Sequence, residues 1–450
     1  MITNLNSATQ IIELNNIKIL TDPWLGEGVF HNSWYGYPPF KKKNLELLNQ
    51  IDFVYISHIH EDHCSEQTLM LLDKNTPCII LEFSEKSIKQ KLERIGFKRI
   101  IEIKHNHKTH LSNEVFITIL AADNCNPEIC NKAFGCFMVD NKKGNTYQID
   151  SMCIIENHDN VILNTNDSPY MISLETIKLI QSKYNSIDFM LVGYTGASLY
   201  PFSMIDYTNE KMIEARDITK TKGLNQAFNF IKSIKPKHYM PHAGTYLLGG
   251  TNWKLNKYSP IPELEEAKEY LNKKLENESI KSKCVLLNQG ESFDLKNNIE
   301  SNEYVPIDIE KRNDYIKKVL SQKKHDYEKL KNIDTLEVEK LIPKAFERLK
   351  MKMKSINFKT ETKVYITYEK DRSLLIDFRK SIPNFEIVSF VDFSNPFNEF
   401  ILDKRLFFNI LRGPRYAHWN SVEGGALLKL RRVPDVYEQG IHLSLCYLHI

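Results

Sequence analysis

The chain has 450 residues, of which 42% are hydrophobic and 26% are charged, and its formal net charge is +3. This composition is typical of a soluble globular protein, and the length predicts two domains, because one core rarely serves more than about 300 residues. Lys and Glu are interspersed, residues 1–10 do not resemble a signal peptide, no apolar run could span a bilayer, and the 8 cysteines are sparse. We therefore expect a cytoplasmic protein with reduced thiols and with no nucleic-acid or membrane partner.

Apolar runs of strand length alternate with amphipathic runs through about residue 295. Two short apolar runs at 10–14 and 17–20 flank Asn15-Asn16, a pair that tolerates turns, and they predict a β-hairpin. The remaining predicted strands are 51–56, 78–83, 115–120, 151–156, 160–163, 189–192 and 237–240, and the predicted helices are 45–48, 85–96, 174–184 and 224–234. This alternation predicts a layered α/β domain.

The sequence pattern changes after residue 294. Residues 308–355 carry many Lys and Glu at helical spacing, which predicts one or two amphipathic helices. Alternating apolar residues then predict strands at 362–368 and 373–378. We therefore predict an α/β catalytic domain at 1–298 and an α+β domain of unknown role at 299–450.

The strongest chemical signal is the segment Ser-His-Ile-His-Glu-Asp-His at 57–63. His58 and His60 are two residues apart after an apolar run, so their side chains project to the same face. A turn would bring Asp62 and His63 to a neighbouring point. One group of ligands would then begin with two imidazoles, and a second group with a carboxylate and an imidazole. Such a pair of groups suits two adjacent divalent cations. The alternative is a polar loop that merely happens to be rich in histidine.

This segment resembles the H-x-H-x-D-H signature of the metallo-β-lactamase superfamily. The resemblance implies an αββα sandwich with two metal ions (zinc, iron or manganese) at one edge of its sheets. It also implies later ligands in loops that follow apolar runs. Asp167 matches the family's bridging aspartate, and His242 matches its late histidine.

The remaining ligand departs from the family pattern. The superfamily usually supplies a third histidine to the first metal, yet the apolar run at 115–120 leads into Ala-Ala-Asp-Asn. Asp123 is therefore the predicted ligand, whereas His105, His107 and His110 lie before that run and are expected to be solvated. A carboxylate at this place favours iron or manganese over zinc.

Further segments resemble one branch of the superfamily, which contains lactonase-like proteins and the CMP-N-acetylneuraminate hydroxylases. The resemblance runs through Asp-Pro-Trp-Leu at 22–25, Pro-Glu at 127–128, Ile-Leu-Asn-Thr at 162–165 and Gly-Ala-Ser at 196–198, and it weakens after about residue 295. The hydroxylases also carry a Rieske iron–sulfur module, whose paired Cys-x-His and Cys-x-x-His ligands this sequence lacks. The branch thus implies shared ancestry and leaves the reaction open.

Four residues outside the ligand set are candidates for supporting or substrate-binding roles. Asp22 could orient a ligand histidine or could simply form an Asp-Pro turn. Tyr194 and Tyr200 could form a pocket wall or could be packing aromatics, and His418 could bind an anionic group or could be solvated. Cys125, Cys130, Cys136 and Cys153 lack the paired spacing of a structural zinc site, so buried thiols are expected.

Three functions are compatible with these residues. The first is a dinuclear metal-dependent hydrolase of a small ester, lactone, phosphoester or nucleotide-sugar-like substrate, with Asp62 and Asp167 as catalytic residues. The second is a di-iron oxygenase on the same fold, which would need an external electron donor. The third is a binding protein with a vestigial site. Hydrolysis ranks first on sequence alone, because the signature serves hydrolases in most of the superfamily.

Overall fold

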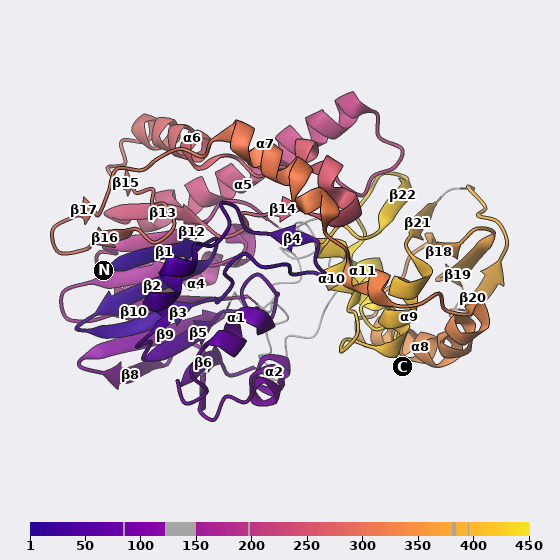
Figure 1. Ribbon diagram of the computed structural model, residues 1–450, viewed down its shortest axis with the longest axis horizontal. Helices are drawn as coiled ribbons and strands as arrows, with labels where there is room; N and C mark the ends of the chain where they lie inside the picture. The colour runs from indigo at the N-terminus through magenta and orange to yellow at the C-terminus, as the bar shows by residue number, and fades with distance from the viewer. Residues whose placement is uncertain (84–85, 122–149, 197–198, 380–383, 395) are drawn as a thin grey trace.

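The structure of the chain, a computed structural model, describes residues 1–83, 86–121, 150–196, 199–379, 384–394 and 396–450. Two β-sheets face each other in the N-terminal part, and helices cover their outer faces (Figure 1). A smaller sheet with its own helices forms the C-terminal part. The predicted fold class, an αββα sandwich followed by an α+β domain, is confirmed.

The first sheet has the strand order β17-β16-β1-β2-β3-β5-β6-β7. Its hairpins are antiparallel, whereas β3, β5, β6 and β7 run parallel to one another. The strands are β1 (Ile2–Asn6), β2 (Thr9–Leu14), β3 (Ile17–Thr21), β5 (Phe53–Ile56), β6 (Cys78–Leu81), β7 (Ile100–Ile103), β16 (Ser292–Asp294) and β17 (Ile299–Glu300). Because parallel strands end at the same edge of a sheet, the loops after β3 and β5 start side by side.

The second sheet has the order β15-β13-β12-β11-β10-β9-β8. Here β11, β12, β13 and β15 run parallel, and β8, β9 and β10 pair antiparallel. The strands are β8 (Lys108–Ser112), β9 (Val115–Ala121), β10 (Ser151–Glu156), β11 (Val161–Asn164), β12 (Phe189–Gly193), β13 (His238–His242) and β15 (Lys283–Cys284). The loops after β11 and β13 therefore leave this sheet at one edge.

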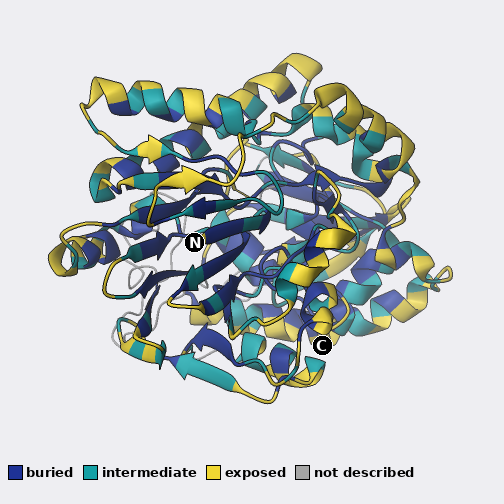
Figure 2. Cartoon of the chain, turned by 60° about the vertical axis from the view of Figure 1, so that its left-hand side comes forward, coloured by how far each residue is buried: buried dark blue, intermediate teal, exposed yellow. Residues whose placement is uncertain are grey.

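Alternate residues of the strands fill the space between the sheets. Ile19 and Tyr55 of the first sheet belong to the same buried cluster as Ile119 and Leu191 of the second. Their neighbours along the strands point outward, as Leu20 does towards the helices. The central strands are thus buried on both faces, as the dark interior of Figure 2 shows. A strand that is buried on both faces needs apolar residues at nearly every position. The central strands therefore appear in the sequence as near-continuous apolar runs.

The helices divide between the two outer faces. The first sheet is covered by α1 (Glu66–Leu71) and α2 (Ser87–Ile95), and the second by α4 (Leu174–Lys183), α5 (Asn209–Ile234) and α6 (Leu264–Asn277). The helix α5 begins well before the predicted residue 224, because the Thr208 side chain caps it by accepting from the Lys211 amide. Its polar first half shows little apolar pattern, since Met212 and Ala215 are its only buried residues there.

The C-terminal domain packs a five-stranded sheet against one long helix and several short ones. Its strands, in the order β20-β19-β18-β21-β22, are β18 (Lys363–Glu369), β19 (Arg372–Asp377), β20 (Asn384–Val388), β21 (Phe397–Ile401) and β22 (Lys429–Val433). The helices are α8 (Thr335–Ser355), α9 (Lys404–Arg412), α10 (Trp419–Gly424) and α11 (Gln439–Leu445). Apolar residues of α8 recur at helical spacing and enter the shared core, among them Val338, Ile342 and Leu349.

The two parts of the chain are joined through a broad contact. Beyond residue 298, β17 still pairs with β16 of the first sheet, and α7 (Ile309–Lys318) packs Ile316 against Tyr35 and Leu247. Met204 forms a β-bridge with Leu430 of the C-terminal sheet. The domain boundary at 298 stays a prediction. Within the described residues, no helix has the length and hydropathy needed to cross a membrane.

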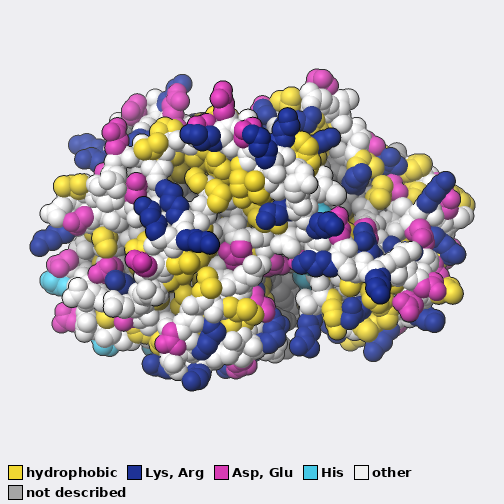
Figure 3. All heavy atoms as spheres, in the orientation of Figure 1, with side chains coloured by type: hydrophobic (Ala, Val, Ile, Leu, Met, Phe, Trp, Pro, Cys, Tyr) yellow, Lys and Arg dark blue, Asp and Glu magenta, His cyan; other side chains and the backbone are white. Residues whose placement is uncertain are grey.

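On the face seen in Figure 3, basic and acidic side chains are interspersed. The near-neutral net charge of the sequence agrees with this mixture. Mixed charge of this kind gives the face no single-sign field for steering a polyanion.

Candidate metal centre

The first sheet positions the signature loop through Asp22 and Ser57, which follow the parallel neighbours β3 and β5. The buried Asp22 carboxylate accepts hydrogen bonds from the Ser57 amide (2.7 Å) and the Ser57 hydroxyl (2.9 Å). A turn follows, in which the amides of His63 and Cys64 both donate to the His60 carbonyl. The turn folds the segment back on itself, so that its four predicted ligands face one region.

The second sheet brings further polar side chains to the same region. Asp150 directly precedes β10, Asp167 follows β11 by three residues, and His242 ends β13. Tyr55 of β5 hydrogen bonds to Ser151 of β10 across the two sheets (2.9 Å), which fixes the first residues of β10 against the signature loop. Donors from both sheets thus meet at one edge of the sandwich.

Two imidazoles and a carboxylate form the first group. The His58 Nε2 and His60 Nδ1 atoms lie 2.9 Å apart, and His58 Nε2 lies 3.3 Å from Asp150 Oδ1. One donor atom from each of the three residues lies within 4.8 Å of the other two, as a common metal ion would require.

The second group surrounds His63. Its Nε2 atom lies 3.3 Å from Asp167 Oδ2 and 3.6 Å from Asp62 Oδ2. Asp167 Oδ2 also lies 4.0 Å from His58 Nε2, so this carboxylate stands between the two groups. His242 is close enough for His63 and Asp167 to act on its pKa. The structure therefore brings together six of the seven ligands that the sequence predicts.

The seventh predicted ligand, Asp123, lies outside the described residues, as do Cys125, Cys130 and Cys136. Asp150 lies beside His58 and His60, where a third donor to the first ion was expected. Sequence reasoning missed it because donors were sought only after apolar runs, and Asp150 stands directly before one. His105 accepts from the Ala121 amide (2.9 Å), and like His107 and His110 it is exposed.

Burial and neighbouring charge set the protonation of the centre. Burial lowers the pKa of His242 to about 3, and burial together with His63 and His60 lowers the pKa of His58 well below its usual value. Burial raises the pKa of Asp62 to about 6. Burial alone would lower the pKa of His63, but Asp167, Asp62 and Asp22 raise it well above its usual value. His58 and His242 are thus neutral imidazoles, the form that binds metals.

The ring nitrogens of His242 also indicate that these residues could bind metal ions. Both ring nitrogens of His242 are buried and have no hydrogen-bond partner among the described residues. A buried polar atom without a partner is costly, and a metal ion would satisfy it. Several carboxylates buried side by side also call for a compensating cation.

The remaining sequence candidates lie in different surroundings. Asp22 Oδ2 lies 3.0 Å from His63 Nδ1, on the far side of that ring from Asp167. His418 is near enough for His60 to contribute, after burial and His449, to a pKa lowered to about 4. Tyr200 packs edge to face on Tyr207 beside the C-terminal core.

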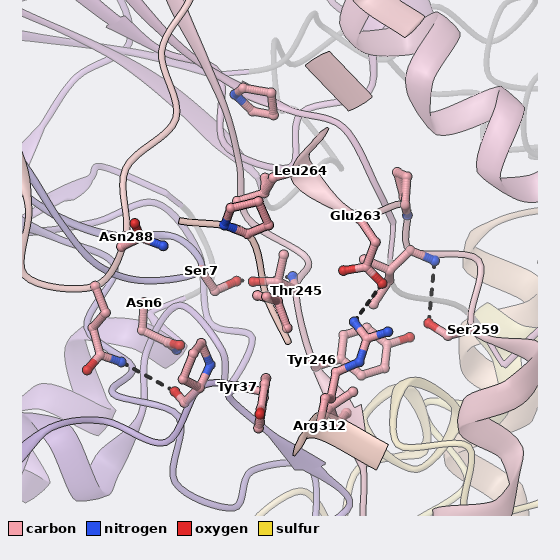
Figure 4. A pocket seen from close by; sticks show the side chains of 18 of the residues that line it. Asn6, Ser7, Tyr37, Thr245, Tyr246, Ser259, Glu263, Leu264, Asn288 and Arg312 are labelled. Atoms are coloured by element: carbon pink, nitrogen blue, oxygen red, sulfur yellow. Dashed lines mark hydrogen bonds and ion pairs between the residues drawn. The ribbon is translucent and has the colours of Figure 1, made fainter. Parts of the chain in front are cut away.

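A cavity of about 1260 Å³, part of which Figure 4 shows, has His242 among its lining residues. Tyr194 and Tyr246 also line it, and their buried hydroxyls have no hydrogen-bond partner among the described residues. Asp62 contributes, after burial, to a raised pKa of Tyr246, so this hydroxyl lies near the second group. Towards the surface, the wall carries the ion pair of Arg312 with Glu263. The cavity is large enough for a small-molecule substrate.

Residues 1–132 match the family model of the beta-lactamase superfamily domain. This match agrees with the resemblance of the signature segment to the superfamily. A putative Rieske 2Fe-2S iron-sulfur protein of Mycolicibacterium smegmatis is 23% identical over 250 residues, which cover 54% of this chain and 43% of that protein. The cytidine monophosphate-N-acetylneuraminic acid hydroxylase of Asterias rubens is 27% identical over 284 residues, covering 58% and 39% respectively. The chain thus spans less than half the length of these curated relatives.

Solved structures of similar fold include enzymes of two kinds. The di-iron β-hydroxylase CmlA of Streptomyces venezuelae matches with a TM-score of 0.40 and 14% identity, over 63% of this chain and 52% of that one. An isothiocyanate hydrolase from Delia radicum gut bacteria matches with a TM-score of 0.42 and 16% identity, over 64% and 97%. TM-scores this low decide nothing about the reaction.

Proposed function

We propose that this chain is a di-iron oxygenase that hydroxylates a small molecule. The observation that carries the proposal is the first group, in which two imidazoles and one carboxylate gather. Two histidines and one carboxylate occur in non-haem iron oxygenases as well as in catalytic zinc sites. A carboxylate in place of a third imidazole makes the group harder and more oxygen-rich, which favours iron. Sequence alone ranks hydrolysis first, although it already predicts a carboxylate ligand for the first ion. The position of Asp150 beside His58 and His60 supports such a carboxylate, and on this ground we rank the oxygenase first.

His58, His60 and Asp150 would hold the first ion, and Asp62, His63 and His242 the second. Asp167 would bridge them, because its Oδ2 atom stands between His58 and His63. Two iron ions bound here would supply the activation of dioxygen. The residues of the chain supply the rest: neutral imidazoles at His58 and His242, and a His63 ring held by Asp22.

Hydroxylation requires electrons from outside the described site. One oxygen atom enters a substrate C–H bond, and the other leaves as water with two protons and two electrons. We propose an external electron donor, because the sequence lacks the paired ligands of a Rieske centre. The proposed substrate enters through the cavity beside His242, where the hydroxyls of Tyr194 and Tyr246 could donate to it.

Dioxygen uptake tests this proposal without a known substrate. The iron-loaded protein, reduced under anaerobic conditions, is mixed with dioxygen in an oxygen-electrode cell. We expect rapid uptake of about one dioxygen per chain, and we expect Asp150→Ala to abolish it because the first iron is lost. Uptake no faster than that of free ferrous ions would contradict an oxygenase.

Hydrolysis is the second candidate, and the match of residues 1–132 to the beta-lactamase superfamily domain favours it. Zinc in both groups would then activate water for attack on an ester or lactone. Zinc-dependent turnover in a screen of lactones and phosphoesters, lost in Asp167→Asn, would establish this candidate over the oxygenase.

A further inference from the structure

A residue of the C-terminal domain touches a proposed metal ligand of the N-terminal domain. The Oδ1 atom of Asn420, at the start of α10, lies 2.9 Å from the Nε2 atom of His60. The two residues are 360 positions apart in the sequence. The other ring nitrogen of His60, Nδ1, faces His58 Nε2 in the first group. His60 is therefore held between the metal centre and the second domain.

The N-terminal domain holds the end of α10 in place. The Ser33 hydroxyl donates to the Gly425 carbonyl (2.6 Å), and the Asn252 side chain donates to the Ala426 carbonyl (2.8 Å). Ala426 is buried in the aromatic cluster that includes Trp34. A Cβ atom at Gly425 would lie only 3.1 Å from the Phe30 carbonyl oxygen, so the two backbones are closely apposed.

The C-terminal domain holds the same helix from the other side. The indole of Trp419 is buried, and its Nε1 atom donates to Glu423 (2.7 Å). Glu423 also hydrogen bonds to His442 of α11. The neighbour of Asn420 in sequence is thus anchored in the core, which leaves little freedom to the backbone that carries the amide.

The hydrogen bond selects one tautomer of His60. A neutral imidazole has one N–H, and an amide oxygen can only accept, so the hydrogen must be on Nε2. The Nδ1 atom then presents its lone pair towards His58 and Asp150. Partners that fix the tautomer and ring orientation of a ligand histidine strengthen metal binding.

We infer that Asn420 is a positioning residue of the first metal group, and that the C-terminal domain completes the centre through it. The inference rests on the proposed metal site. It gives residues 299–450 a defined role, because the N-terminal domain alone would lack the acceptor for His60. Asn420 is itself exposed, so replacing it should not disturb folding.

Cobalt titration of the full-length apoprotein tests the inference, with the visible d–d absorption as the readout. The wild-type chain is expected to bind two Co²⁺ ions. Asn420→Ala should weaken one of them by about 10- to 100-fold and leave the other unchanged. Asn420→Asp should restore the affinity to within about threefold, because it keeps an oxygen acceptor at the same position.

Asn252→Ala is the matched control, since it removes another hydrogen bond between the domains without touching a ligand. It should leave both affinities unchanged. Unchanged binding in Asn420→Ala, or an equal loss in Asn252→Ala, would overturn the positioning role and leave the metal centre standing. A wild-type chain that binds no cobalt would overturn both proposals.

Discussion

Asp22 shows how a single buried side chain orders the centre. Its backbone has a positive φ of 42°. Its carboxylate hydrogen bonds to the Ser57 amide, the Ser57 hydroxyl and His63 Nδ1. The last contact leaves His63 Nε2 facing Asp62 and Asp167. A carboxylate that hydrogen bonds to the ring nitrogen facing away from the metal raises the basicity of a ligand histidine and fixes its orientation.

Replacing this carboxylate should weaken the second metal. In Asp22→Asn one oxygen becomes an N–H₂ donor, so the three contacts can no longer all be made. We expect metal affinity at the second group to fall by about 10- to 100-fold. Equilibrium dialysis followed by elemental analysis measures this. Asp52→Asn is the control, because among the described residues the Asp52 carboxylate accepts only from the Lys18 amide (2.8 Å). Equal metal loss in both variants would argue against the role of Asp22.

Asp150 should decide which metal the first group prefers. Asp150→His would give that group three imidazoles, which suit zinc. When the variant is purified in parallel with the wild type from the same medium, we expect its iron content to fall and its zinc content to rise. An unchanged iron-to-zinc ratio by elemental mass spectrometry would contradict a choice made by this carboxylate.

The buried face of the helix α8 should contribute much of the stability of the C-terminal domain. In α8 the side chain of Ile342 is fully buried in the core, whereas Leu336 on the same helix is 60% exposed. Ile342→Ala should lower the free energy of unfolding by about 2 to 5 kcal/mol, through lost burial and a cavity. Leu336→Ala should change it by less than about 0.5 kcal/mol. Urea unfolding followed by circular dichroism measures both, and equal effects would contradict this packing.

The sequence predicted strands well where both faces are buried, since β5, β9 and β12 are almost continuously apolar. It missed β8, whose residues are exposed or half-buried at a sheet edge and carry no apolar pattern. The segment at 45–48 falls in a 3-10 helix, Lys42–Leu48, which buries only Asn44. Local patterns therefore identify elements only where the tertiary structure buries them strongly.

Some residues of the candidate site could likewise be predicted from the sequence, and others could not. The segment 57–63 was predictable because its donors are close in sequence and follow an apolar strand. Asp150 joins them only because β10 lies against β9 and Tyr55 reaches Ser151. The contact of Asn420 with His60 depends on the packing of two domains, so the sequence alone does not place the two residues together. Tertiary contacts of this kind leave no periodicity to detect.

At the scale of the whole molecule, one contact should make the stability depend on pH. It lies where residues 325–326 pack against the N-terminal domain. His325 is fully buried, its Nε2 atom lies 3.1 Å from the Thr251 hydroxyl, and the amide of Asp326 donates to the His31 carbonyl. Burial lowers the pKa of His325 below its usual value of 6.5. In the pH range between this lowered pKa and 6.5, the unfolded chain therefore binds a proton at His325 that the folded chain does not.

Stability should accordingly fall as the pH drops below about 6.5, and His325 should account for part of the slope. In His325→Gln this part is absent, so the free energy of unfolding should depend less steeply on pH. Urea unfolding at several pH values from about 7.5 to about 5 measures both slopes. Parallel slopes in the variant and the wild type would show that His325 does not contribute.

The proposed dinuclear iron site draws on seven donors and on a contact from the C-terminal part of the chain. Elemental mass spectrometry on full-length protein, purified without chelator from cells supplied with iron, zinc and manganese, tests this claim most directly. We expect two iron ions per chain. Zinc in both sites would contradict the oxygenase, and a chain without transition metal would contradict the metal centre itself.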